Sequence, residues 1–187
     1  KELLTSDKCD EYSKKAYEKL ADGKVSEVEL ASALLDLSAM LHKHYAVAPI
    51  IIIDEYDTPI QQGYQKDYYD KVIRFMRNLF SGGFKDNQHL SFGFLTGILR
   101  VAKESIFSGM NNLSINSVLD NKYSAYFGFT ADEVREMAAY YDAADKYDEI
   151  CQWYDGYLFG KTEIFNPWSV VSYFSNKCEP RPFWVST

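Results

Sequence analysis

The stretch Pro49–Asp57, with the sequence PIIIIDEYD, contains the feature that decides the fold of this 187-residue chain. Its four consecutive isoleucines favour a strand that is buried on both faces, in the middle of a parallel sheet covered by helices on each side. Carboxylates follow at Asp54, Glu55 and Asp57. Because the C-terminal ends of parallel strands face the ligand crevice of an open α/β sheet, we expect an acidic site at the end of a strand near residues 49–55.

The segments around this strand alternate between helix and strand signals. Ser26 and Glu29 have the spacing of a capping box, and leucines at helical spacing follow them. A further helix is predicted over residues 67–80, with a stop at the Ser-Gly-Gly of 81–83, and a second buried strand over 90–97. The order helix, strand, helix, strand predicts a parallel α/β sheet with right-handed crossovers.

The pattern changes in the second half of the chain. Thr130–Glu133 has the spacing of another capping box, and a turn-rich aromatic segment over 154–165 favours a small hairpin. Asn166-Pro167 is typical of the start of a last helix. We therefore predict an α/β core in residues 1–114, followed by a mainly helical, lid-like subdomain with a small aromatic hairpin in residues 115–187.

Composition and charge restrict the class of protein. The net charge of -7 argues against wholesale non-specific binding of nucleic acid, because phosphate contacts need clustered lysine and arginine. The three cysteines lie far apart and have no CxxC spacing, so they indicate reduced thiols rather than a zinc site or disulfides, as in a cytoplasmic protein. No apolar run approaches the roughly 20 residues of a membrane span, so we expect no membrane partner.

The acidic strand end supports two interpretations on its residues alone. In the first, Asp54 holds Mg²⁺ directly or through a water, and Glu55 orients a water and takes its proton as the water attacks a terminal phosphate. In the second, residues 54–57 are the acidic, solvated loop that follows a buried strand. The residues themselves favour the two interpretations about equally.

Several further segments, taken together with this one, resemble a known family. They are 51–60 (IIIDEYDTPI), 96–113 (TGILRVAKESIFSGMNNL), 126–130 (YFGFT), and 153–157 (WYDGY) with 166–170 (NPWSV). In this order, over roughly residues 45 to 187, they are similar to the predicted AAA-ATPase-like family. Its members are P-loop NTPase modules that are often linked to a nuclease-like domain of the PD-(D/E)XK type. The resemblance implies a partial parallel-sheet P-loop core flanked by helices, with a Walker B strand near 49–55 and a sensor strand near 90–97.

The resemblance also implies roles for particular residues. Asp54 would be the metal residue, which binds Mg²⁺, and Glu55 the catalytic residue that activates water. Thr96 would lie where related ATPases keep a polar sensor near the γ-phosphate. The resemblance implies that Thr96 and Asp57 bind the cofactor. The implied cofactors are ATP and Mg²⁺, in the full-length parent protein.

Arg100 is the second catalytic candidate that the resemblance implies. It occupies the same sensor segment as Thr96, and a guanidinium can bind phosphate oxygens through two hydrogen bonds. The alternative is a structural arginine that pairs with Glu104, four residues further on at helical spacing. Both interpretations of Arg100 stay open, as does the choice between Arg100 and Thr96 as the sensor.

The sequence departs from the family at the phosphate-binding loop. The motif G-x-x-x-x-G-K-[ST] is absent, and Gly160-Lys161-Thr162 lacks the first glycine, because position 155 is an aspartate. The chain begins at Lys1, so we expect the loop to lie upstream in a longer parent. We therefore expect the parent to convert ATP and water to ADP and phosphate, and the 187-residue chain alone to be inactive.

Two other functions are alternatives to a nucleotide-dependent switch. A non-enzymatic interaction scaffold with a degenerate ATPase fold is the serious alternative. A nuclease site built from Asp54 and Asp57 is disfavoured, because its third element would be residues 120–122 in a polar turn. The expected partners are ATP, a nuclease-like domain downstream in the same chain, and further copies in a homo-oligomer.

The histidines give only a weak signal. His42 and His44 are two residues apart near a helix end, so they face different sides and would not converge on one metal ion. His89 lies in a polar loop. The sequence therefore predicts no metal or catalytic role for histidine.

Overall fold

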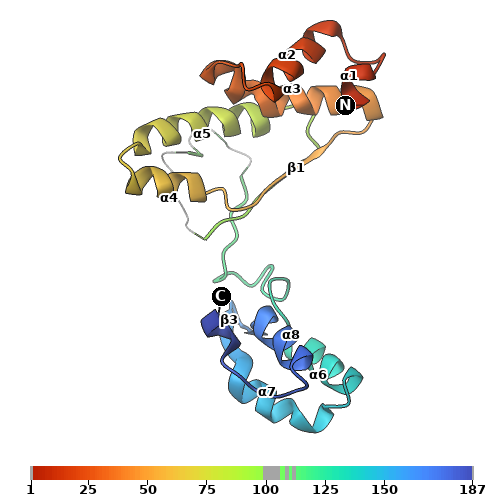
Figure 1. Ribbon diagram of the computed structural model, residues 1–187, viewed down its shortest axis with the longest axis vertical. Helices are drawn as coiled ribbons and strands as arrows, with labels where there is room; N and C mark the ends of the chain where they lie inside the picture. Colours follow the sequence, from red (N-terminus) through yellow and green to blue (C-terminus); the bar gives the residue numbers. More distant parts are fainter. Residues whose placement is uncertain (1, 99–105, 108–109, 111–112, 187) are drawn as a thin grey trace. The chain divides into compact units, whose positions relative to one another are not determined.

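The computed structural model describes residues 2–98, 106–107, 110 and 113–186. The chain divides into two compact units, residues 1–113 and 114–187 (Figure 1). The first unit contains α1 (Glu2–Thr5), α2 (Glu11–Ala21), α3 (Glu27–Tyr45), β1 (Ile50–Ile53), α4 (Thr58–Gln65), α5 (Tyr69–Phe84) and β2 (Phe92–Leu95). The second contains α6 (Ala131–Tyr140), the 3₁₀ turn η1 (Ala144–Lys146), α7 (Tyr147–Tyr154), β3 (Asp155–Phe159), β4 (Thr162–Phe165), α8 (Pro167–Ser175) and η2 (Phe183–Ser186).

The first unit is built on the predicted parallel strand pair. β1 and β2 run in parallel, with Ile50 opposite Phe92 and Ile53 opposite Leu95. One face of the pair packs against the apolar side of α4 and α5, in a cluster centred on the fully buried Phe80. The predicted α/β class and the parallel pairing are therefore confirmed, while the identity of this pair as a P-loop core stays a prediction.

The other face of the same strand pair is exposed. Ile52 is 70% exposed and Phe92 is 59% exposed, and Ile50 and Phe94 lie on the same face and are exposed as well. The expectation that helices cover both faces is therefore wrong for the described part of the chain. The apolar run is continuous in sequence, but only alternate residues such as Ile51 and Ile53 reach the core.

The close approach of α3 and α5 corrects a second expectation. The Ser-Gly-Gly of 81–83 was expected to end the helix, yet α5 continues through it to Phe84. A Cβ on Gly83 would lie 2.8 Å from Cδ1 of Leu34 on α3, and one on Gly82 would lie 3.0 Å from the carbonyl oxygen of Ala31. The two glycines are thus contact residues that let the α5 backbone approach α3.

Helix α4 is an element that the sequence analysis does not predict. In the structure Asp57 is the N-cap residue and Pro59 lies in the first turn of α4. Proline suits this position, because the first turn of a helix leaves its amide groups without intrahelical partners.

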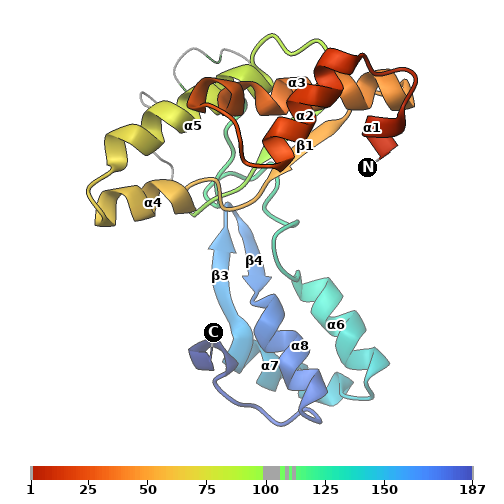
Figure 2. The same ribbon diagram turned by 45° about the horizontal axis from the view of Figure 1, so that its top comes forward.

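The amino-terminal helices α1 and α2 lie along α3 (Figure 2). The capping box predicted at the start of α3 is present, since Ser26 accepts from the Glu29 amide and the Glu29 carboxylate accepts from the Ser26 amide. Near the other end of α3, Lys43 forms an ion pair of 2.8 Å with Asp10, the N-cap residue of α2. The hydrogen bond from Lys43 holds the pKa of the Asp10 carboxyl well below its usual range.

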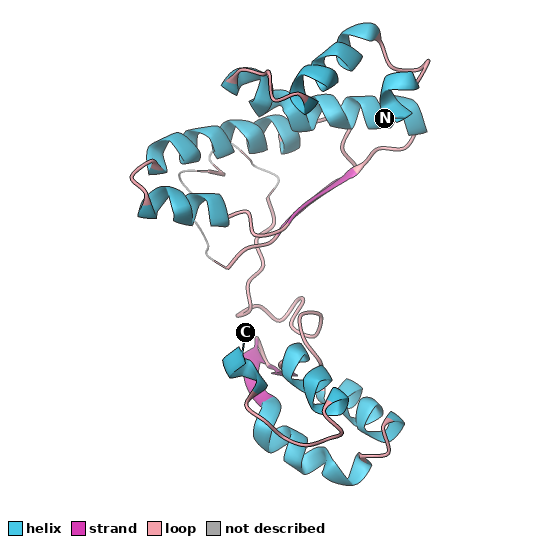
Figure 3. Cartoon of the chain, viewed as in Figure 1, coloured by secondary structure: helices cyan, strands magenta, loops and turns pink. Residues whose placement is uncertain are grey.

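The second unit combines three helices with a short antiparallel hairpin (Figure 3). Helices α6, α7 and α8 pack with β4 around buried side chains that include Val134, Ile150, Phe165 and Tyr173. The capping box at Thr130, the hairpin and the Asn166 cap of α8 are all as predicted.

The Gly-Lys-Thr triplet of the second unit lies in the turn of this hairpin. Gly160 and Lys161 connect β3 to β4, and Gly160 has a φ of 55°, which suits glycine. The triplet therefore forms a hairpin turn between antiparallel strands. Among the described residues, no helix is long and apolar enough to cross a membrane.

Candidate functional site

The candidate site lies where β1 and β2 end. Asp54 follows β1, Thr96 follows β2, and the hydroxyl of Thr96 donates a hydrogen bond to Oδ1 of Asp54. Backbone hydrogen bonds hold the two ends together: the Thr96 amide donates to the Ile53 carbonyl at 2.9 Å, and the Tyr56 amide donates to the Thr96 carbonyl at 3.0 Å. Two of the predicted site residues, 42 positions apart in sequence, are thus in direct contact.

Glu55 lies beside this contact in an unusual backbone conformation. Its φ is 51°, in the left-handed region that residues other than glycine seldom adopt. Its amide donates to Oδ1 of Asp54 at 2.9 Å, and its exposed carboxylate accepts a weak hydrogen bond from the Thr58 hydroxyl at 3.4 Å. The turn therefore points the Glu55 carboxylate into solvent next to Asp54. Such strained positions concentrate at functional sites, which makes this one a reason to test the residue.

Asp57 is placed differently from the other two carboxylates. It is 1% exposed, and its Oδ2 accepts a hydrogen bond of 2.9 Å from Nε2 of Gln61 on α4. A Cβ on Gly97 would lie 2.6 Å from Oδ1 of Asp57, so the segment after β2 closes over this carboxylate. The geometry favours a role in fastening the start of α4 to the end of β2. Its assignment as a cofactor-binding residue stays a prediction.

Arg100, the second catalytic candidate, lies outside the described residues, and so does Glu104, its alternative partner. Of the predicted site residues, the structure therefore places Asp54, Glu55, Asp57 and Thr96.

The side chains around Asp54 fit a magnesium ion. They offer carboxylate and hydroxyl oxygens, which Mg²⁺ prefers, and Mg²⁺ is commonly held by one or two carboxylates together with substrate phosphates and water. Within the described ranges, no three or more His, Cys, Asp or Glu side chains gather into a group that could hold a metal ion. The donor set is therefore suited to an ion that a phosphate ligand shares, rather than to one enclosed by protein ligands.

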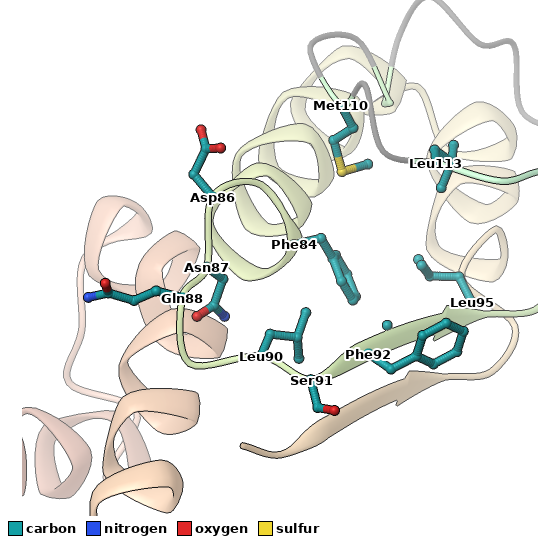
Figure 4. A pocket seen from close by; sticks show the side chains of 11 residues that line it. Phe84, Asp86, Asn87, Gln88, Leu90, Ser91, Phe92, Leu95, Met110 and Leu113 are labelled. Atoms are coloured by element: carbon teal, nitrogen blue, oxygen red, sulfur yellow. The ribbon is translucent and has the colours of Figure 1, made fainter. Parts of the chain in front are cut away.

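Two hollows in the first unit lie apart from these residues. The first has a volume of about 590 Å³ and lies beside β2 and the end of α5. Figure 4 shows Phe84, Leu90 and Met110 pointing toward one another there, while Asp86 and Gln88 point away. The second, of about 920 Å³, lies at the turn between α4 and α5. Neither is lined by Asp54, Glu55 or Thr96, and in the part of the chain that the structure describes Asp54 and Glu55 are exposed at the end of β1.

One of the comparisons with known proteins identifies the family. The family model described as predicted AAA-ATPase matches residues 2–107, more than half of the chain, and the chain belongs to this family. The chain is also similar to an uncharacterized protein in the vnfD 5' region of Azotobacter chroococcum mcd 1, with 35% identity over 139 residues. The aligned part covers 74% of this chain and 27% of that protein, so the chain spans about a quarter of the length of this relative. No solved structure matches the chain.

Some neighbours of the site were not singled out from the sequence. Thr58 and Gln61 contact the Glu55 and Asp57 carboxylates from α4, a helix that the sequence analysis did not predict. The signal that was available is Pro59, which is typical of the first turn of a helix and would have placed both residues close to the acidic turn.

Proposed function

We propose that this chain forms part of an ATP-binding and ATP-hydrolysing AAA-like ATPase, which uses the nucleotide as a conformational switch. The observation that carries the proposal is the hydrogen bond between Thr96 and Asp54 at adjacent ends of parallel strands. Ligands of open α/β sheets bind outside the carboxyl ends of the strands, where these two side chains lie. Membership of the predicted AAA-ATPase family supports the same conclusion.

Each residue has a distinct role in this proposal. Asp54 holds Mg²⁺, directly or through a bound water, and Thr96 fixes the orientation of the Asp54 carboxylate. Bound Mg²⁺ would neutralise charge on the phosphates. Glu55 accepts a proton from the attacking water, because its carboxylate is exposed beside Asp54 and makes only one weak hydrogen bond among the described residues.

The proposed activity belongs to the natural protein that contains this chain. Phosphate binding in P-loop enzymes uses the amides and the lysine of a glycine-rich loop, and that motif does not occur in these 187 residues. Residues outside the chain would therefore hold the phosphates, while Asp54, Glu55 and Thr96 act on the metal and the water.

Magnesium-dependent binding of ATP by the natural protein tests the proposal. Replacing Thr96 with valine keeps the shape but removes the hydrogen bond to Asp54, and we expect it to weaken Mg²⁺-dependent binding by about tenfold. Asp54→Asn should weaken it at least as much. Asp86→Asn changes an exposed carboxylate after α5 and should leave binding unchanged. Equal affinities in wild type, Asp54→Asn and Thr96→Val would refute the assigned metal site.

A second candidate function is a non-enzymatic interaction scaffold. The exposed apolar face of the β1–β2 pair favours it, because continuous apolar surface on a sheet is normally covered. This function predicts that the natural protein holds no nucleotide in calorimetry at any Mg²⁺ concentration. Retention of nucleotide by the wild type, with the losses described for Thr96→Val and Asp54→Asn, would decide against it.

A further inference from the structure

His42 and His89 form a close pair that the sequence does not reveal. His42 lies in the last turn of α3, and His89 lies in the segment that leads into β2. Their Nδ1 atoms are 3.2 Å apart, and the two rings meet edge to face with their centroids 5.4 Å apart. Both side chains are half-buried. Two nitrogen donors, 47 positions apart in sequence, therefore converge on one point of the first unit.

The protein holds both rings in place through the backbone around them. His42 lies in the regular helix α3, which ends at Tyr45. On the other side, the amide of His89 donates to Oδ1 of Asn87 at 3.0 Å, and Nδ2 of Asn87 donates to the Gly83 carbonyl at 2.8 Å. The His89 segment is thus tied to the end of α5, which fixes the backbone of the second histidine near the end of α3.

The separation of the two nitrogens is that of two ligands on one metal ion. Metal–nitrogen bonds of about 2.0–2.1 Å in a tetrahedral site place the two nitrogens roughly 3.3 Å apart, close to the 3.2 Å between these Nδ1 atoms. Imidazole suits Zn²⁺, Ni²⁺ and Cu²⁺, whereas Mg²⁺ prefers oxygen ligands. We infer that His42 and His89 bind a divalent transition-metal ion of the zinc, nickel or copper type, with water completing its coordination.

This metal site is separate from the candidate nucleotide site. His42 and His89 precede β1 and β2, whereas Asp54 and Thr96 follow them. The four residues of β1 span about 13 Å, so the two sites lie at opposite ends of the strand pair. A bound ion would fasten the end of α3 to the entry of β2, and the inference does not depend on ATP binding.

The coordination chemistry sets the number of protein ligands and the state of the two rings. Within the described ranges no group of three or more His, Cys, Asp or Glu side chains surrounds a common point, so the ion has two protein ligands. Without a metal, a proton on one Nδ1 would let that nitrogen donate a hydrogen bond to the other. Binding the ion uses the lone pairs of both Nδ1 atoms, so each neutral ring then carries its proton on Nε2.

Nuclear magnetic resonance with Ni²⁺ tests the inference on the unmodified chain, which has only three histidines. Paramagnetic Ni²⁺ broadens the signals of the imidazoles that bind it. We expect one equivalent of Ni²⁺ to remove the His42 and His89 ring signals together. The ring of His44 lies against Ser6, with its Nδ1 2.8 Å from Oγ, and as a neighbour that does not bind the ion it should broaden less than the other two. Broadening of His44 that is stronger than that of His42 or His89, or no broadening of His42 and His89 at one equivalent, would overturn the inference.

Variants provide a second readout, by calorimetric titration with Zn²⁺ in the presence of excess Mg²⁺. His89→Gln changes a loop residue and should abolish binding of the single ion while the far-ultraviolet circular dichroism stays unchanged. His44→Gln is the matched control, because it removes a half-buried histidine of the same helix turn, and it should bind Zn²⁺ like the wild type. Binding by His89→Gln at wild-type affinity, or loss of binding in His44→Gln, would contradict the assignment.

Discussion

The two units of this chain bury their apolar residues to very different extents. In residues 114–187, the helices and the hairpin all contribute to one core around the fully buried Tyr173. In residues 1–113, the buried side chains form two separate clusters, one between α5 and the strand pair and one between α3 and the amino-terminal helices. The second face of the strand pair remains exposed.

This difference indicates which part of the chain leaves an apolar face of a sheet uncovered. In the second unit, buried residues of α6, α7 and α8 meet in a single core, although large side chains such as Leu119, Leu158 and Trp168 are exposed. The first unit has isoleucine on both faces of β1 and phenylalanine on the exposed face of β2, and it covers only the other face. A parallel strand with apolar residues on both faces is typical of a sheet covered on both sides.

The largest expected effect tests the closed core of the second unit. Tyr173→Ala removes a fully buried ring and its hydrogen bond of 2.8 Å to Glu149, so we expect it to lower the free energy of unfolding by about 4 kcal/mol. All three tryptophans, Trp153, Trp168 and Trp184, lie in this unit. Their fluorescence during urea unfolding therefore measures the second unit alone.

The control for this prediction is Tyr140→Ala, a tyrosine on the surface of α6. It should change the free energy of unfolding by no more than about 0.5 kcal/mol. If the two variants unfold at the same urea concentration, the description of Tyr173 as the centre of the core is wrong.

A smaller effect compares the two faces of the strand pair. Ile53→Ala removes methyl groups that pack against the α5 cluster, and we expect a loss of about 2 kcal/mol. Ile52→Ala, on the neighbouring residue but the exposed face, should cost less than about 0.5 kcal/mol. Hydrogen exchange of the β1 and β2 amides measures both variants, because the first unit has no tryptophan.

Equal losses for the two isoleucine variants would mean that something covers the face of Ile52 in solution. Both faces of the strand pair in the first unit would then be covered, and the contrast drawn above between the two units would be wrong. A small loss for Ile52→Ala alone keeps the contrast as described.

The smallest effect concerns a feature that the units share. Ser26→Ala and Thr130→Ala each remove the hydroxyl that takes part in a capping box, and each should cost about 1 kcal/mol. The backbone amides of these two residues, followed by their hydroxyls, donate the hydrogen bonds that lower the pKa values of Glu29 and Glu133. Because these pKa values are lower in the folded state, the stabilisation is present above the unfolded value of about 4.3 and is lost as the pH falls through the folded value.

Urea unfolding at neutral pH and at pH about 3 checks the capping prediction in both units. The cost of Thr130→Ala should shrink at the acidic pH, where the wild type has itself lost part of the stabilisation. A cost that stays the same at both pH values would show that the Glu133 carboxylate does not contribute.

Local signals in the sequence predicted much of this fold. The capping boxes, each strand of the parallel pair and the Asn166 cap depend on residues within a few positions of one another, and they were predicted from those residues. The parallel pairing joins residues 42 positions apart and was inferred from the order of helices and strands. The exposed face and the helical Gly82–Gly83 were missed, because both depend on which surface lies opposite, and that is not encoded locally.

The candidate sites also divide into residues that could be predicted from the sequence and a pairing that could not. Asp54 and Glu55 were recognisable from the apolar run before them, and Thr96 was identified through its resemblance to a family segment. The pairing of His42 with His89 was invisible, because the two residues are brought together only when the end of α3 meets the entry of β2.

The central claim of this account is that Asp54 and Glu55 form the metal and water residues of an ATPase. The most direct test is ATP turnover by the natural protein that contains this chain, measured beside its Glu55→Gln variant. We predict that the wild type hydrolyses ATP and that Glu55→Gln slows turnover by about 100-fold or more while still binding nucleotide, because it loses only the proton acceptor. Turnover by Glu55→Gln at the wild-type rate, or absence of both turnover and bound nucleotide in the wild type, would contradict the claim.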